Sequence, residues 1–505
     1  MKAEIRKTAS RFRHTIGKYR VQRGKQCKSC SGCVVACPHG VHFKAGTRMG
    51  TPRDYLCVGP DVCKSQDCFC VEKCPNQALN VAINPQLKAL GDFRWTADLL
   101  MSTWYQAETG ELPTVDLEYR TGNSGGGFDK LRFRFPEKPL QTIPVDEIDT
   151  SIDLNKRGDN SHRITIAIPL YQGGMSFGSV SDIAIPLYQG GMSFGSVSDS
   201  TMVSRAKAAM LWGTFGCTGE GGYPEFLYPF DQQMITQVAT GLFGVKEETI
   251  QRVRIVEFKY AQGAKPGLGG HLLGDKVTER VAKMREAVKG SALFSPFPFH
   301  SVYSVEDHKK HVDWIKAMNP KALVSVKVST PADVDMVAIG SYYAGAHIVH
   351  LDGSYGGTGA APDIAKKNIA MPIEYAIPKV HRFLVEEGVR EKVTLIASGG
   401  IRTAHDVLKA IALGADGVVE GTAGMVALEC TRCSSCESGR GCPRGIATTD
   451  PELAELITVD WGAQRVYNLY ASWRKQIVGV LQQLGMRSIR ELVGRTDCLR
   501  HLDYN

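Results

Sequence analysis

The stretch "TLIASGGIRTAHDVLKAIALGADGVVEGTAG", residues 394–424, shows the fold class most clearly. A short apolar run ends in two glycines, a segment with helical spacing of apolar residues follows, and a second apolar run ends in further glycines. Alternation of strands and helices is typical of parallel α/β proteins. This stretch therefore predicts two parallel strands joined by a helix.

The same alternation begins at about Ile164. The apolar runs are "IAIPLY", "RIVEFKY", "ALVSVKV", "AHIVHLDG", "VTLIASGG" and "GADGVVEG". Nearly every run leads into a polar or glycine-rich loop: "GGMSFGS", "QGAKPGLGG", "GSYGGTGAAP", "GGIRTAHD" and "GTAGM". In a (β/α)8 barrel the loops after the strands build the active site, and the late loops bind phosphate. We therefore predict an α/β fold, a TIM barrel whose last loops present backbone N–H groups to a phosphate.

The composition is that of a globular protein, with 43% hydrophobic and 22% charged residues in 505. The net charge of +8 is concentrated between Lys2 and Lys28, where ten Lys and Arg face one acid, Glu4. This segment is interpreted either as a solvated arm or as a docking surface for an acidic partner such as a ferredoxin. Without an aromatic-rich basic face, nucleic acid is not expected as a partner. With no membrane-length apolar run and no secretory segment, we predict a cytoplasmic protein. No glycine cluster has the context of a dinucleotide-binding fingerprint.

The first cysteine group, "CKSCSGCVVACPHG", has the C-x2-C-x2-C-x3-C-P spacing of bacterial ferredoxins. A second group ends in Cys74 before Pro75. In the ferredoxin pattern, one [4Fe-4S] cluster is held by Cys27, Cys30, Cys33 and Cys74, and a second by Cys37 with three of Cys57, Cys63, Cys68 and Cys70. Which of these four is not a ligand stays open. A zinc module is disfavoured because the third x2 step and the C-P endings do not suit zinc.

The sequence resembles the glutamate synthase family in its FMN-binding synthase domain, from about Ile164 to Leu453. The segments that carry the resemblance are "GGMSFGSVS", "CTGEGGYPE", "QGAKPGLGGHLLGDKV", "HSVYSVEDHKKHVDWIKAMNPKALVSVKV", "GGTGAAP" and "ASGGIRTAHDVLKAIALGADGV". With the cysteine-rich N-terminus, the chain resembles the short archaeal-type members. The limits expected are 1–85 for a ferredoxin-like domain, 86–163 for a pre-barrel segment, 164–429 for the FMN-binding barrel, 430–450 for an iron–sulfur loop, and 451–505 for C-terminal helices.

The resemblance implies that reduced FMN delivers hydride to 2-iminoglutarate, made from 2-oxoglutarate and ammonia, to give L-glutamate. Lys265 and Lys327 are expected to supply cations for the dicarboxylate, Lys327 also near the flavin N1, and Glu220 to handle a proton or bind ammonia. Gln262 completes the catalytic candidates, and His300 is a further one. The expected cofactor-binding residues are Gly191, Met192, Ser193, Gln262, Lys327, Asp352, Gly356, Gly357, Thr358, Gly359, Ser398, Gly399, Gly400, Gly421 and Thr422.

Four further cysteines follow the barrel in "CTRCSSCESGRGCPRGIAT". By the resemblance, Cys430, Cys436 and Cys442 hold a [3Fe-4S] cluster. Cys433 is an additional thiolate, so either a [3Fe-4S] or a [4Fe-4S] cluster is expected.

Nothing in the chain matches the glutaminase domain that opens full-length family members. Ammonia is therefore expected from solution or from a separate glutaminase subunit, and electrons from a ferredoxin or an NADPH-oxidising flavoprotein subunit. Two alternatives remain: a synthase-like subunit acting on another amine, as in N-methylglutamate synthase, or an electron-transfer subunit that does not turn over 2-oxoglutarate.

Residues 166–182 and 183–199 repeat the same 17 residues, "IAIPLYQGGMSFGSVSD", without a difference. A barrel has room for one such strand, and only the second copy runs directly into the helical "STMVSRAKAAMLWG". We therefore predict that the second copy forms the first barrel strand. The loop with Gly191, Met192 and Ser193 is expected to touch the flavin, and Gly174, Met175 and Ser176 are not.

Overall fold

The computed structural model describes residues 4–11, 17–113, 127–137, 143–159, 165–166, 185–296, 298–356, 361–437 and 439–504. The chain divides into two compact units, Ala9–Met101 and the remainder, Met1–Thr8 with Ser102–Asn505. The smaller unit thus extends beyond the expected limit at residue 85, and helix α3 (Ala97–Thr109) crosses the boundary.

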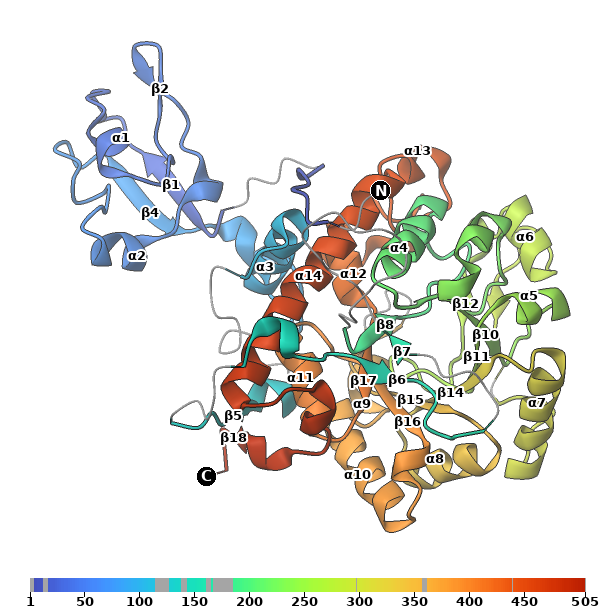
Figure 1. The fold of residues 1–505 in the computed structure, drawn as a ribbon. Coiled ribbons are helices and arrows are strands. Elements are labelled where there is room, and N and C mark those ends of the chain that lie inside the picture. Colours follow the sequence, from blue (N-terminus) through green and yellow to red (C-terminus); the bar gives the residue numbers. More distant parts are fainter. Residues whose placement is uncertain are drawn as a thin grey trace. The chain divides into compact units, whose positions relative to one another are not determined.

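The larger unit is built on eight parallel strands. Figure 1 shows this sheet with helices around it. Their spatial order is β8-β17-β16-β15-β14-β11-β10-β9, which follows the chain around the sheet. This arrangement confirms the predicted α/β barrel. The strands are β8 (Leu187–Gln189), β9 (Gly216–Cys217), β10 (Met234–Ala239), β11 (Ile255–Lys259), β14 (Leu323–Ser329), β15 (Ile348–Asp352), β16 (Thr394–Ser398) and β17 (Gly417–Glu420).

The barrel closes between its first two strands. The Gln189 N–H donates to the Phe215 carbonyl at 2.9 Å, and the Met192 N–H donates to the Cys217 carbonyl at 3.2 Å. Strand β8, which makes the closure, comes from the second copy of the 17-residue repeat, as predicted. Of the first copy, only Ile166 is described, in strand β7 (Thr165–Ile166), so the prediction for Gly174, Met175 and Ser176 lies outside the described residues.

Helices follow most of the strands and cover the barrel (Figure 1). They include α4 (Asp199–Leu211), α5 (Glu247–Arg252), α7 (Val305–Met318), α8 (Val334–Tyr343), α10 (Ile373–Glu386), α11 (Ala404–Ala412) and α12 (Thr422–Ala427). Helix α14 (Val459–Leu484) packs against α4, α11 and α12. In the part of the chain that the structure describes, no helix combines the length and apolarity that crossing a membrane requires.

Two segments depart from the alternation that the sequence shows. A 3-10 helix, η5 (Glu225–Gln233), connects β9 to β10, neither of which stands out as an apolar run. Between β11 and α7 the chain forms a small hairpin, β12 (His271–Leu272) with β13 (Leu293–Phe294), and helix α6 (Glu279–Arg285). This excursion begins beside the carboxyl end of β11 and carries several site residues.

The smaller unit contains an antiparallel pair, β1 (Tyr19–Arg23) with β4 (Leu79–Ile83), and the short helices α1 (Gly32–Ala36) and α2 (Pro60–Ser65). One buried apolar cluster of this unit consists of Val21, Cys33, Val41, Cys70 and Leu79. Among the described residues, further buried apolar side chains are Cys63, Ala78, Leu87, Trp95, Leu99 and Leu100.

Candidate active site

A ladder of charged side chains fills the carboxyl half of the barrel interior. Successive side chains of a strand point to opposite faces, so Glu257 and Lys259 of β11 share a face. Lys259 is in register with Lys327 of β14, and Lys327 is in register with His350 of β15. Asp352 lies two residues beyond His350 and therefore on the same face. The strand register thus assembles the ladder.

Hydrogen bonds join the side chains of the ladder. Ser398 Oγ donates to Asp352 Oδ1 at 2.5 Å, so it accepts from His350 Nε2 at 2.7 Å. The other ring nitrogen, Nδ1, lies 2.9 Å from Glu257 Oε2, which accepts. One ring nitrogen of His350 thus faces the Glu257 carboxylate, and the other faces the Ser398 hydroxyl, which in turn reaches Asp352.

Lys327 completes the charge balance, with Nζ 3.1 Å from Asp352 Oδ2. Burial would raise the pKa of Asp352, yet Lys327 and His350 lower it to about 2. Burial likewise opposes ionisation of Glu257, whose pKa His350 and Lys327 lower to about 2. The pKa of Lys327 is raised because Asp352 and Glu257 outweigh its burial. Lys327 is therefore a buried cation that counters the two buried carboxylates, Glu257 and Asp352.

A second group of charges surrounds Glu220, on the loop after β9. Its Oε2 accepts from Lys259 Nζ at 3.0 Å, and only 7% of the residue is exposed. Burial would raise the pKa of Glu220, but Lys259, Arg285 and Lys265 together lower it. The pKa of Lys265 is lowered by burial and by the charge of Lys259. An anion placed beside Lys265 would therefore be stabilised strongly.

The flavin-loop candidates lie beside this group. Ser193 Oγ accepts from the Glu220 N–H at 3.1 Å, which joins the loop after β8 to the loop after β9. A Cβ on Gly191 would lie 3.1 Å from the Cα of Gly219. Gln262 Nε2 donates to the Gly269 carbonyl at 3.3 Å. His300 is exposed, and among the described residues no hydrogen bond or ion pair joins it to this group.

The late loops carry the features expected of a phosphate site. Gly399 and Gly400 have φ values of 99° and 94°, and strands β16 and β17, which precede the two loops, are paired. Within the described residues, no hydrogen bond uses the backbone N–H of Gly399, Gly400, Gly421 or Thr422. Ser354 Oγ, after β15, is also buried without a partner there. Gly356 lies against Ala264, whereas Gly357, Thr358 and Gly359 lie outside the described residues.

The cysteine loop after the barrel packs near the same face. Burial raises the pKa of Cys430 to about 12, and the charges of Cys436 and Cys442 add to it, so the three thiols lie close together. The charge of Cys433 in turn contributes to the raised pKa of Cys436. The buried Lys276 Nζ donates to the Cys436 carbonyl at 2.6 Å. The charge of Glu437 acts to raise the pKa of Lys265. The loop therefore adjoins the Lys265 group.

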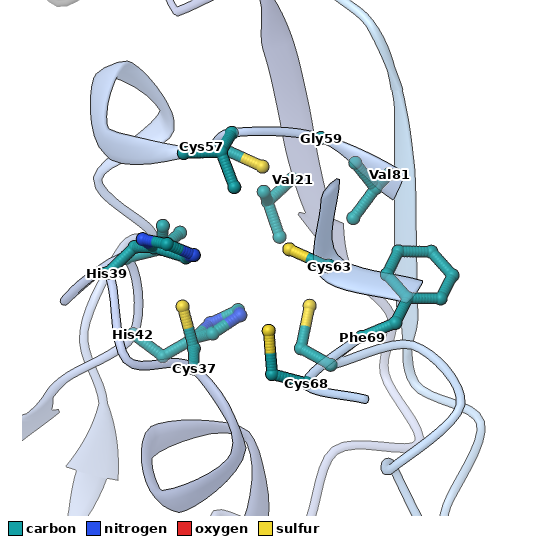
Figure 2. A pocket seen from close by; sticks show the side chains of 13 residues that line it. Val21, Cys37, His39, His42, Cys57, Gly59, Cys63, Cys68, Phe69 and Val81 are labelled. Atoms are coloured by element: carbon teal, nitrogen blue, oxygen red, sulfur yellow. The ribbon is translucent and has the colours of Figure 1, made fainter. Parts of the chain in front are cut away.

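In the smaller unit the second cysteine group lines one cavity, shown in Figure 2. Cys37, Cys57, Cys63, Cys68 and Cys70 all contribute to its wall. In the first group, the charge of Cys27 contributes to the raised pKa of Cys33. A Cβ on Gly32 would lie 3.8 Å from the Cys30 thiol and 3.9 Å from Pro75, the residue after Cys74. The division of these cysteines into two cluster-binding sets stays a prediction.

Sequence reasoning did not single out Lys259, Arg285, Glu257 or His350. Lys259 had a usable signal, because it is the last residue but one of the run "RIVEFKY", as Lys327 is of "ALVSVKV". Arg285 comes from helix α6 far from any strand end, and only folding brings it to Glu220.

Comparison with known proteins finds a matching family and several similar chains. The conserved region in glutamate synthase matches residues 129–487. The archaeal-type glutamate synthase (NADPH) of Thermotoga maritima is 36% identical over 501 residues, covering 94% of this chain and 92% of that protein. The archaeal glutamate synthase (NADPH) of Methanocaldococcus jannaschii is 36% identical over 97% of this chain and 96% of its own length. The flavin-binding domain of baker's yeast flavocytochrome b2 has a TM-score of 0.43 and 18% identity, over 80% of this chain and 86% of that chain.

The molecule is a (β/α)8-barrel oxidoreductase, a class in which loops at the carboxyl ends of the strands form the active site. More specifically, the chain belongs to the glutamate synthase family.

Proposed function

We propose that this chain reductively aminates 2-oxoglutarate to L-glutamate at the carboxyl end of the barrel. The observation that carries the proposal is the buried group of Lys259, Lys265 and Arg285 around Glu220. Cations outnumber the carboxylate that they surround, and a buried surplus of positive charge favours an anionic ligand. A dicarboxylate satisfies two cations at once, and the relatives' name, glutamate synthase, supports 2-oxoglutarate as that ligand.

Lys265 would bind a substrate carboxylate. Burial and the charge of Lys259 lower the pKa of Lys265, so an incoming carboxylate would stabilise the ammonium group and satisfy its hydrogen bonds. Glu220, held ionised by Lys259, would attract ammonium and accept a proton as the amine adds to the keto carbon. Gln262, on the same loop as Lys265, would orient the substrate.

The residues present fit a bound FMN. Its phosphate would be held by the partnerless N–H groups of the two late loops, those of Gly399, Gly400, Gly421 and Thr422. The flavin ring would be lined by the Gly191–Ser193 loop together with Gly356 and Asp352. FMN, when bound, supplies the hydride that reduces the imine carbon. Lys327, kept charged by Asp352, would place a fixed cation at the ring.

The cysteines fit electron delivery to this site. Cys27, Cys30, Cys33 and Cys74 would hold one [4Fe-4S] cluster, and the cavity group a second. Cys430, Cys436 and Cys442, with Cys433 as a further thiolate, would hold the third. The relatives' names support NADPH as the ultimate donor, reaching this chain through a flavoprotein partner, with a ferredoxin as the other candidate. Ammonia would come from solution or from a separate glutaminase.

The test is anaerobic reoxidation of the dithionite-reduced protein on addition of 2-oxoglutarate and 15N-ammonium. We expect flavin reoxidation with stoichiometric 15N-glutamate. Lys265→Met should lower kcat/KM for 2-oxoglutarate by about 100-fold, because a buried charge-assisted hydrogen bond contributes about 3 kcal/mol. Lys309→Met is the matched control, since Lys309 lies in an exposed pair with Asp313 and should leave turnover unchanged.

Two outcomes would reject the proposal. A reducible flavin that ignores both substrates would indicate an electron-transfer subunit. Reoxidation with methylamine but not ammonium, giving N-methylglutamate, would indicate a synthase that acts on another amine.

A further inference from the structure

The excursion after β11 carries two buried lysines that face different groups. Lys265, near its start, belongs to the candidate substrate site. Lys276, in the 3-10 helix η6 (Gly274–Lys276), is 9% exposed and donates from Nζ to the Cys436 carbonyl at 2.6 Å. Glu437, the residue after Cys436, acts electrostatically on both lysines. The excursion thus connects the candidate substrate site to the cysteine loop after the barrel.

Lys276 joins the two sides of this cysteine loop. Besides the Cys436 carbonyl, its Nζ donates to the Ala447 carbonyl at 3.4 Å, and that carbonyl also accepts from the Cys442 N–H at 3.1 Å. Both acceptors are backbone oxygens, and in the part of the chain that the structure describes no ion pair neutralises Lys276. A buried ammonium group is costly unless negative charge lies close to it.

The thiols of the loop can supply that negative charge. The charges of Cys436 and Cys442 both act on Lys276. The loop itself contributes Arg432 and Arg444, whose charges act on the same group of cysteines, and Lys276 adds a cation from outside the loop. A cluster held by these thiolates becomes one charge more negative when it accepts an electron. A buried cation beside it therefore stabilises the reduced form more than the oxidised form, because burial weakens the screening of their attraction.

We propose that Lys276 raises the reduction potential of the cluster held by the cysteine loop, so that this cluster accepts electrons from the external donor more readily. The proposal rests on the proposed function, in which Cys430, Cys436 and Cys442 bind a cluster. Lys276 is a positioning residue here, because it acts through the cluster and the loop around it. Its contribution has two parts, a fixed charge and two hydrogen bonds, which substitutions can separate.

The experiment is an anaerobic dithionite titration of the full chain, with the clusters followed by EPR. The signal that Cys442→Ala removes identifies the cluster of the loop. Its midpoint potential should become more negative in Lys276→Met and stay close to the unmodified value in Lys276→Arg. Lys289→Met is the matched control, since Lys289 lies on the same excursion in an exposed pair with Glu279 and should leave the potential unchanged. An intact cluster with an unchanged potential in Lys276→Met would overturn the proposal.

Lys276→Gln separates the charge from the hydrogen bonds and keeps the test decisive if Lys276→Met does not fold. The amide still donates to the loop carbonyls but carries no charge, so the potential should again become more negative. An unmodified potential in Lys276→Gln, or failure of this variant to assemble the cluster, would show that Lys276 only holds the loop. Unmodified protein purified without iron and acid-labile sulfide would instead reject the clusters of the proposed function, a result distinct from a cluster whose potential ignores residue 276.

Discussion

At the scale of single residues, the barrel interior is governed by paired charges. Glu257 and Asp352 are buried carboxylates that stay ionised because His350 and Lys327 lie against them. Breaking such a pair is costly, since the remaining charge stays buried without compensation. The ladder thereby fixes the position of Lys327 at the mouth of the barrel.

These carboxylates should make the barrel sensitive to acid. The pKa of Glu257 is lowered from 4.5 to about 2, so its contribution is present above about pH 4 and is lost as the pH falls through about 2. The contribution corresponds to ~3 kcal/mol. Urea unfolding followed by circular dichroism should therefore show a smaller free-energy loss on acidification in Glu257→Gln than in the unmodified protein.

The control for this prediction is Glu248→Gln, which removes an exposed carboxylate 3.8 Å from Arg252. Exposed pairs contribute little, so its acid profile should match that of the unmodified protein. A Glu257→Gln profile of undiminished slope would show that the ladder does not set the acid response.

At the scale of elements, the loops after β11 and β15 approach closely at Gly263. A Cβ there would lie 1.8 Å from the Gly353 carbonyl oxygen, and the Gly263 N–H donates to Asp352 Oδ2 at 3.0 Å. Only glycine permits this contact between the loop with Gln262 and Lys265 and the loop with Gly356.

Gly263→Ala should therefore force the two loops apart. We expect a loss of about 1–3 kcal/mol in stability and weaker flavin retention, measured by thermal unfolding and by flavin content after gel filtration. Gly479→Ala, in helix α14, is the control, because a Cβ there meets nothing within 4 Å. It should raise stability by up to about 1 kcal/mol. A Gly263→Ala protein as stable and as yellow as the unmodified one would contradict the close approach.

The duplicated strand gives a second prediction at this scale. Deleting residues 166–182 or 183–199 produces the same chain, because the copies are identical. The barrel uses one strand at this position, β8. The shortened protein should therefore keep its flavin and activity, with unfolding at an equal or slightly higher temperature because a shorter connection costs less closure entropy. Insoluble or flavin-free protein would show that both copies are needed.

At the scale of the whole molecule, the two compact units have different sources of stability. The barrel unit has an extensive apolar core, whereas the described residues of Ala9–Met101 bury far fewer apolar side chains, three of which are cysteines. Ligands that bind only the folded state contribute directly to its stability, and metal sites do so strongly.

Removing the clusters should thus unfold one unit before the other. Anaerobic calorimetry of the intact protein is expected to show a transition for Ala9–Met101 that disappears after treatment with ferricyanide and a chelator. The barrel transition should remain. If treated protein kept both transitions, the smaller unit would be shown to fold without metal.

The sequence by itself determined the class of fold and most of the residue types at the site. Apolar runs followed by glycine loops predicted a parallel barrel, and strand-end position selected Lys265 and Lys327. Cysteine spacing sorted the thiols into groups, because ligand spacing along the chain is a local property. Strand β9, with two residues, and β10 escaped notice, since a short strand leaves no periodicity to detect.

Only the tertiary structure decided which charges meet. Register between β11, β14 and β15 joins Glu257, Lys327 and His350, and the excursion after β11 brings Arg285 to Glu220. Pairing between residues distant in the chain depends on strand register and loop path, and neither is encoded in the local pattern of residue types.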